Sequence, residues 1–315
     1  MDPLKPVGEL AYVALVSRDI DRAARFFETT LGLARADLPA GSTARTAPVF
    51  AAGRSAIALF AAGDPFLGGA EKAGVHHLAF GAPDPDEAAA RAEAAGIPCL
   101  PEAAGPGLQC RRRLALDPAA TAGVRAYIAE PIERRSPPPG KVERIDHVGV
   151  ASVDNRAAID IFCGRLGLAL ESQQTDMEVE IPVESFTSDK YGVVYHSRPA
   201  RPVGGLRVAF VTAGDCELEF LQNFDPAQGS FIDHAGAGTT RQDQGAITRY
   251  IANRGAGLHH LALKVDDINA VLADVRRDGF ATIDQVGRPG SRRALIAFVQ
   301  PRGLGGVLVH FVQRE

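Results

Sequence analysis

The stretch GLHHLAL at residues 257–263 occurs a second time, almost unchanged, as GVHHLAF at residues 74–80. A second repeat relates YVALVSRDIDRAARFFETTLGL, which starts at Tyr12, to HVGVASVDNRAAIDIFCGRLGL, which starts at His147. The two repeats divide the chain into two halves, and each half contains two similar modules. SPPPG at residues 136–140 has the composition of a linker, so we predict domains at residues 1–135 and 141–315.

Each module shows the same order of predicted elements. It opens with an alternating apolar segment such as IDHVGVA (145–151), which is typical of a strand. An acidic turn such as Asp266-Asp267 follows, and its side chains can cap a helix. A helix of about 12 residues is expected next, ended by a glycine such as Gly279. Further alternating segments close the module, so we predict an α+β protein of four βαβββ modules.

The composition is that of a soluble globular protein. The chain has 315 residues, of which 46% are hydrophobic and 23% charged, and its formal net charge is −4. This balance argues against a nucleic-acid partner or an anionic membrane surface. The N-terminal MDPLKPVGEL lacks the features of a signal peptide, and no apolar run approaches the roughly 18 residues of a membrane span. We therefore expect a cytoplasmic protein that binds a small molecule.

The four modules resemble those of the vicinal oxygen chelate superfamily, which includes glyoxalase I, methylmalonyl-CoA epimerase, extradiol dioxygenases and bleomycin-resistance proteins. The resemblance covers nearly the whole chain. It is most specific at GLHHLALKVDDINAVLADVRRDGF (257–280), which is similar to the C-terminal module of methylmalonyl-CoA epimerases. The resemblance implies that two modules pair into a cup of strands around one divalent metal ion, and that the protein forms a homodimer.

Two histidines at the starts of strands are the first implied metal ligands. His147 and His260 occupy corresponding positions in the two modules of the second half. In the superfamily, the histidines at these positions point into the cup and bind the metal. Because side chains alternate along a strand, we expect His260 on the cup face with Ala262, and His259 on the opposite face with Leu261.

The other two implied ligands lie on the last strand of each module. They are Glu219 in CELEFLQ (216–222) and His310 in GVLVHFVQ (306–313). Here the chain departs from the family, because epimerases and dioxygenases usually have glutamate where His310 stands. Histidine can still bind zinc, cobalt, nickel or iron, and manganese is a further candidate. With one carboxylate in the set, a bound divalent ion retains a net positive charge.

The same four positions in the first half are Tyr12, Ala58, His77 and Tyr127. One good ligand cannot hold a metal ion. The resemblance therefore implies that the first half is a degenerate domain, which supports the second half, covers its mouth or mediates association.

The second half carries a longer, polar insertion, PVESFTSDKYGVVYHSR at residues 182–198. We hypothesise that it reaches over the cup and binds the substrate through polar side chains. An exposed, solvated hairpin is an equally good interpretation. The candidate substrate-binding residues are Glu184, Lys190, Tyr191, Tyr195 and His196.

The resemblance implies a metal-dependent enzyme, and its C-terminal module favours an epimerase or isomerase. Such an enzyme moves a proton α to a carbonyl through a metal-stabilised enolate, on an acyl thioester or a polyhydroxy ketone such as a keto-cyclitol. The two glutamates that act in the epimerases correspond to His310 and to a position near Val208, and neither is an acid here. The candidate proton-transfer residues are therefore Glu219 and His310, with Glu184 as a further possibility.

Two other functions fit the same sequence. An Fe(II)-dependent dioxygenase, which cleaves an aromatic ring or acts on a keto acid, is the first alternative, because four modules with a degenerate first half resemble that branch. A non-catalytic binding protein of the bleomycin-resistance kind is the second. It needs an aromatic-lined cleft, and the chain has no tryptophan.

Overall fold

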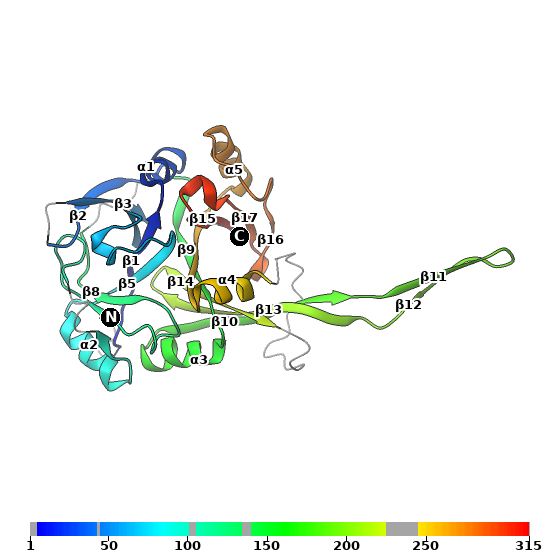
Figure 1. Ribbon diagram of the computed structural model, residues 1–315, viewed down its shortest axis with the longest axis horizontal. Coiled ribbons are helices and arrows are strands. Elements are labelled where there is room, and N and C mark those ends of the chain that lie inside the picture. Colours follow the sequence, from blue (N-terminus) through cyan, green and yellow to red (C-terminus); the bar gives the residue numbers. More distant parts are fainter. Residues whose placement is uncertain (1–4, 43–44, 101–104, 134–139, 225–244, 315) are drawn as a thin grey trace.

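In the computed structural model, two curled sheets of eight strands lie side by side, and a long two-stranded arm projects from the second (Figure 1). The structure describes residues 5–42, 45–100, 105–133, 140–224 and 245–314. The strand order is β2-β3-β4-β1-β5-β8-β7-β6 in the first sheet and β10-β13-β14-β9-β15-β18-β17-β16 in the second. The matching orders confirm that the two halves have one architecture.

The first sheet uses strands from residues 10–129: β1 Leu10–Ser17, β2 Arg35–Pro39, β3 Thr46–Ala52, β4 Ser55–Ala61, β5 Gly74–Gly81, β6 Cys99–Leu100, β7 Arg113–Leu116 and β8 Ala126–Ala129. The second uses β9 Val142–Ala151, β10 Ala169–Glu180, β13 Arg201–Ala213, β14 Cys216–Phe224, β15 Gly257–Val265, β16 Arg288–Pro289, β17 Leu295–Phe298 and β18 Val309–Gln313. The arm ends in β11 Val183–Ser188 and β12 Gly192–Ser197.

The helices are α1 Ile20–Arg25, α2 Pro85–Ala94, α3 Asn155–Ile159, α4 Ala246–Arg254 and α5 Ile268–Arg277, with π-helical turns at Phe26–Thr30 and Asp160–Arg165 and 3₁₀ turns at Pro65–Leu67, Ser291–Arg293 and Pro301–Leu304. As predicted, aspartates cap the module helices: Asp267 accepts from the backbone N–H groups of Asn269 and Ala270. The predicted helix length is approached by α2 and α5, with 10 residues each. In the other two modules a shorter α-helix continues into a π-helical turn.

The four βαβββ modules are confirmed, and their first strands meet at the centre of each sheet. Strand β9 pairs antiparallel with β15 and parallel with β14, and β1 pairs with β5 and β4 in the same way. Each curled sheet therefore has one concave face, formed by two modules, as the resemblance implies.

The two halves share one hydrophobic core. Alternate side chains of the central strands, such as Val13 and Val148, enter this core together with Phe26, Phe162 and Phe280. The opposite faces line the two cups. The predicted linker at residues 136–140 lies almost entirely outside the described residues, so the division at that point stays a prediction. Among the described helices, none is both long enough and apolar enough to cross a bilayer.

Candidate metal centre

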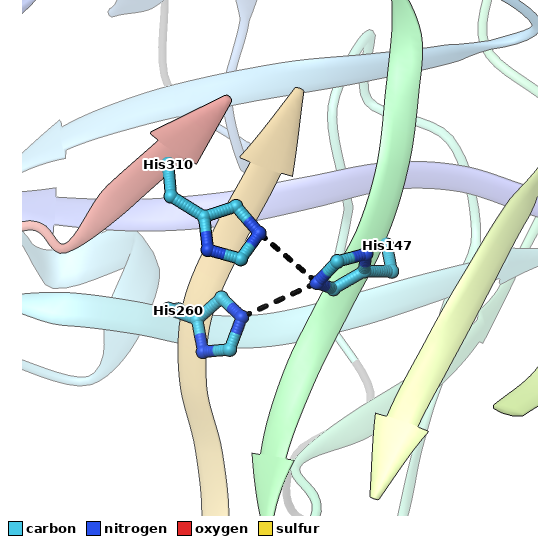
Figure 2. Close-up of side chains that lie close together, drawn as sticks. All are labelled: His147, His260 and His310. Atoms are coloured by element: carbon cyan, nitrogen blue, oxygen red, sulfur yellow. Dashed lines mark hydrogen bonds between the residues drawn. The ribbon is translucent and has the colours of Figure 1, made fainter. Parts of the chain in front are cut away.

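Four ligand-type side chains converge in the cup of the second half. Figure 2 shows the rings of His147, His260 and His310 directed at one another from β9, β15 and β18. The Nε2 atom of His147 lies 3.4 Å from that of His260 and 3.1 Å from that of His310. Glu219 Oε2, on β14, lies 3.2 Å from His147 Nε2 and 3.5 Å from His260 Nε2. All four side chains are buried.

The distances from His147 Nε2 to the other three ligand atoms are close to those of a tetrahedral metal site. Ligand atoms bound to one ion at about 2.0–2.1 Å lie about 3.4 Å apart at tetrahedral angles. Each of the three histidines can offer one ring nitrogen to a metal ion, and these three nitrogens all lie within 4.8 Å of one another. The three histidines therefore form a group that can hold a metal ion, and Glu219, which lies close to two of them, is the fourth candidate ligand.

A β-bulge directs His260 into the cup. The pairing of β15 with β9 shifts between Leu258 and His260, so His259 is an extra residue on β15. The predicted direction of His259 is therefore wrong: Leu261 enters the shared core, whereas the Nδ1 atom of His259 lies 2.9 Å from that of His260. Simple alternation fails here because it assumes unbroken pairing.

Gly149 makes room for the His260 ring. It stands opposite His260 in the register, and a Cβ atom at this position would overlap the imidazole. Gly149→Ala should displace the ring and weaken metal binding about tenfold or more, without removing any ligand. Equilibrium titration with a divalent metal checks this result. Gly105→Ala is the matched control, because nothing lies within 4 Å of a Cβ atom there, and equal affinities of the two variants would contradict the packing argument.

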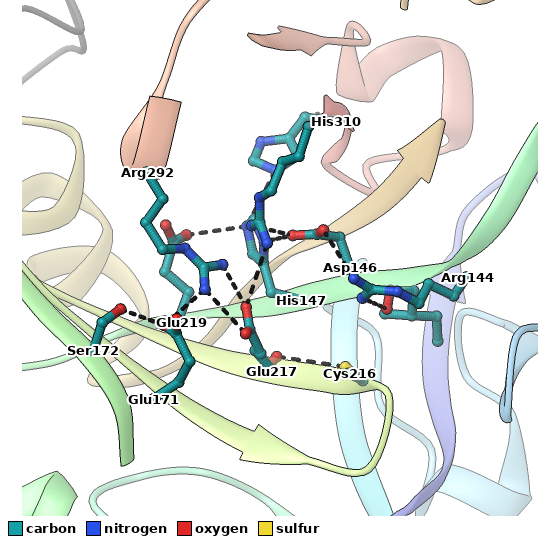
Figure 3. A network of polar contacts seen from close by, with 12 residues as sticks. Arg144, Asp146, His147, Glu171, Ser172, Cys216, Glu217, Glu219, Arg292 and His310 are labelled. Carbon is teal, nitrogen blue, oxygen red and sulfur yellow. Dashed lines mark hydrogen bonds and ion pairs between the residues drawn. The ribbon is translucent and has the colours of Figure 1, made fainter. Parts of the chain in front are cut away.

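Two of the histidines are oriented by neighbours. His147 Nδ1 lies 2.7 Å from Asp146 Oδ1 (Figure 3). Asp146 also contacts Arg314 at 2.6 Å. His259 places its Nδ1 beside that of His260. Because Nδ1–H of a metal-binding histidine can donate to such partners, both contacts favour the tautomer whose Nε2 is free to bind a metal. The Nδ1 atom of His310 is buried and has no partner among the described residues.

The electrostatics of the cup separate one charged histidine from two neutral ones. Burial disfavours the charged form of His147, but the Glu219 and Asp146 carboxylates outweigh it and raise the pKa of His147 to about 9. Burial lowers the pKa of His260, and burial together with the neighbouring histidines lowers that of His310 well below its usual range. The pKa of Glu219 is far below normal, because the contact with His147 outweighs burial. Binding of a metal ion then requires the loss of a proton from His147.

Arg292 closes the cup over this cluster. Its guanidinium lies 3.5 Å from the centre of the Phe210 ring, and it forms ion pairs with Glu217 and, at 2.8 Å, with Glu171 (Figure 3). Glu171 belongs to β10 and Arg292 follows β16, the two edge strands of the sheet. The ion pair thus joins the sheet edges, and the remaining cavity beside the histidines is about 30 Å³.

Loss of this closure should speed the exchange of a bound metal. Arg292→Met removes the ion pairs, so a chelator should strip the metal several-fold faster, with a smaller effect on equilibrium affinity. Stopped-flow measurement with a chromogenic chelator checks this. Arg293→Met is a close control, because Arg293 is exposed and, like Arg292, has a positive φ. Identical stripping rates for both variants would contradict a role for Arg292 in closure.

The structure adds one candidate residue that the sequence analysis missed. Asp176 on β10 pairs with Leu206 of β13, and Leu206 belongs to the apolar lining of the cup. The Asp176 side chain is 3% exposed; one oxygen accepts a hydrogen bond from Gln174 and the other has no partner among the described residues. Burial and the charge of Glu219 raise the pKa of Asp176 to about 6. A second carboxyl group with an unusual pKa therefore lies on the cup face.

The polar insertion does not reach over the cup of its own chain, so that part of the prediction is wrong. Strands β10 and β13 continue beyond the sheet, and their extension carries β11 and β12 away from the body (Figure 1). Tyr191 and Tyr195 are each 71% exposed, and Glu184 forms an ion pair with Arg198 of the arm itself. Substrate binding by Glu184, Lys190, Tyr191, Tyr195 and His196, and the homodimer, stay predictions.

In the first half, Arg113 lies among the residues that correspond to the four candidate ligands of the second half. The Arg113 guanidinium lies 4.0 Å from the centre of the Phe66 ring and 4.6 Å from that of Tyr127. Burial, then the charges of His76 and Arg113, holds the pKa of His77 well below its usual range. Among the described residues, the metal-competent histidine group lies in the second half alone. The first cup thus contains a permanent cation of the protein itself.

The fold and the cup define the class of protein to which this chain belongs. Residues 9–119 and residues 146–298 each match the sequence profile of the Glyoxalase/Bleomycin resistance protein/Dioxygenase superfamily. The chain is a member of this superfamily, in agreement with the resemblance found from its motifs.

Two kinds of protein are found among the individual relatives: methylmalonyl-CoA epimerases and a 4-hydroxymandelate synthase. Mitochondrial methylmalonyl-CoA epimerase from Mus musculus is 24% identical over 181 residues, which are 57% of this chain and 78% of the relative. The Homo sapiens protein of the same name is 27% identical over 36% of this chain and 54% of its own length. Among solved structures, a variant of 4-hydroxymandelate synthase from Streptomyces coelicolor aligns over 98% of this chain and 93% of its own, with a TM-score of 0.63 and 16% identity. This last likeness shows the fold alone.

Proposed function

We propose that the protein is a metal-dependent epimerase or isomerase, which moves a proton at the carbon next to a carbonyl group. The group formed by His147, His260 and His310, with Glu219 at 3.2 Å from His147 and 3.5 Å from His260, carries the proposal. The similarity to methylmalonyl-CoA epimerases supports the same reaction class. An acyl thioester and a polyhydroxy ketone such as a keto-cyclitol are the two candidate substrate classes.

The proposed ligands suit zinc, cobalt, nickel, manganese or iron in the divalent state. Three neutral histidines and one carboxylate leave a net positive charge on such an ion. When bound, the ion supplies a Lewis acid that polarises a carbonyl oxygen and increases the acidity of the adjacent carbon. The protein's own residues must then supply the base.

Asp176 is our proposed base. Glu219 was a candidate for this role, but its Oε2 lies within 3.5 Å of two histidine nitrogens, which favours a role as ligand. His310 is likewise directed at the other histidines. Asp176 retains an oxygen without a partner in the described part of the chain, and a carboxyl group with a pKa of about 6 can both accept and return a proton near neutral pH.

Exchange of substrate protons with solvent deuterium tests the proposal. We expect the metal-loaded protein to incorporate deuterium next to the carbonyl of at least one compound in a panel of acyl thioesters and keto-cyclitols, without consuming O₂. The panel is assayed in D₂O by NMR, with an oxygen electrode in parallel. Turnover in air combined with silence under anaerobic conditions would overturn the epimerase assignment in favour of a dioxygenase.

A further inference from the structure

A polar cleft of about 150 Å³ lies where the two halves meet. Strand β5 of the first half contacts β15 of the second at this junction. Lys72, His76 and Arg125 line the cleft from the first half, and Tyr250 and Arg254 line it from the second. Neither half forms this cleft without the other.

Backbone packing fixes the position of the cleft walls. A Cβ atom on Gly123 would overlap the carbonyl oxygen of Ala256, and one on Gly257 would lie 2.7 Å from the carbonyl oxygen of Gly123. Arg254 Nη1 also donates a 2.7 Å hydrogen bond across the junction to the carbonyl of Ala73. Direct contact between the two backbones therefore fixes the segments that carry Arg125 and Arg254, and the hydrogen bond orients the Arg254 side chain.

The cleft collects positive charge. Within the described ranges, no carboxylate lines it, and Lys72 and Arg125 form no ion pair. The half-buried arginines of the neighbouring cup differ, since Arg292 pairs with Glu217 and Arg314 with Asp146. All three side chains are exposed, so solvent screens them in part, but three like charges around one cavity still give it a positive potential that favours an anion.

We propose that this cleft binds a compact polyanion, such as a phosphoryl or pyrophosphoryl group. Arginine and lysine together suit phosphate oxygens, since the guanidinium can form paired hydrogen bonds and the ammonium adds a point charge. The cleft also adjoins the candidate metal centre: the Tyr250 ring contacts the His259 ring at 4.6 Å, and His259 contacts His260. The anion can be part of the substrate of that centre or a separate small molecule.

Calorimetric titration with inorganic pyrophosphate at constant ionic strength tests the site. We expect saturable binding to the full chain and a loss of about tenfold or more in the double variant Lys72→Gln/Arg125→Gln. The control Arg112→Gln/Arg302→Gln removes the same charge from exposed positions that do not line the cleft, and should bind as the wild type does. Absence of saturable binding, or equal weakening in both double variants, would overturn the proposal.

Competition distinguishes the two sources of the anion. If the group belongs to a coenzyme A thioester substrate, free coenzyme A should displace pyrophosphate from the cleft. If it belongs to a separate molecule, pyrophosphate should remain bound in the presence of coenzyme A. Both results support an anion site, and only the first depends on the proposed function. If the deuterium-exchange assay fails while pyrophosphate still binds, the epimerase proposal is rejected and the anion site is retained.

Discussion

His260→Ala is expected to lose its metal and all metal-dependent activity, whereas His77→Ala should keep both. The two histidines occupy matching positions in the repeated strands β15 and β5. His260 faces His147, His310 and Glu219, but His77 lies among Tyr12, Tyr127 and the Arg113 guanidinium. A guanidinium nearby opposes the binding of a second cation.

The expected difference in metal affinity exceeds about a hundredfold, because removal of a direct ligand costs more than the tenfold to hundredfold typical of outer contacts. Elemental analysis of the two variants, purified without a chelating tag, gives the metal content per chain. Similar metal loss in both variants would show that the first half also holds a metal centre. Thermal unfolding of the metal-free proteins provides the control that both variants fold.

Asp176→Asn should abolish proton exchange while leaving the metal bound. The amide preserves the size of the side chain and can still pair with Gln174, but it cannot accept a proton as a base. We expect exchange to fall by about a hundredfold or more. Glu180→Gln, an exposed change on the same strand, should behave as the wild type does.

The pH dependence of the wild type provides a second readout of Asp176. A base acts in its deprotonated form, so the exchange rate should fall as the pH drops through about 6, the raised pKa of Asp176. Asp176→Asn should lack that acidic limb in whatever exchange remains. A residual rate that still falls below pH 6 in the variant would assign the limb to another group.

The four candidate ligands could be placed from the sequence because the resemblance to the vicinal oxygen chelate superfamily marks their positions in the repeated modules. The sequence predicts His147 and His260 at strand starts, but both lie well inside their strands, β9 and β15, whereas Glu219 and His310 are on the last strands as predicted. Strand order then brings β14, β9, β15 and β18 next to one another. The repeat predicts that both halves share one fold. It also predicts that only the second half can bind a metal ion, because Tyr12, Ala58 and Tyr127 stand where the second half has ligand-type residues.

Features that depend on pairing between distant strands were not predictable. The bulge at His259 arises from the register of β15 against β9, which no local pattern reveals. Asp176 lies in ALESQQTDMEVE (169–180), a polar strand without apolar alternation, and its face becomes clear only through its partner Leu206. The direction of the arm likewise depends on where β10 and β13 leave the sheet.

The basic cleft illustrates the same limit across the two halves. Lys72 and Arg125 come from different segments of the first half, and Arg254 lies at the end of α4 in the second. Each residue alone is an ordinary exposed cation. Their combination depends on the close approach of Gly123 to Gly257, which only the docked halves produce.

Anomalous diffraction from crystals of the cobalt-loaded protein locates the bound metal ion without reference to activity. We expect one strong peak at the cobalt absorption edge, within bonding distance of His147, His260, His310 and Glu219, and no peak in the first cup. A peak beside His77 and Tyr127, or no peak among the four side chains at full cobalt loading, would contradict this expectation.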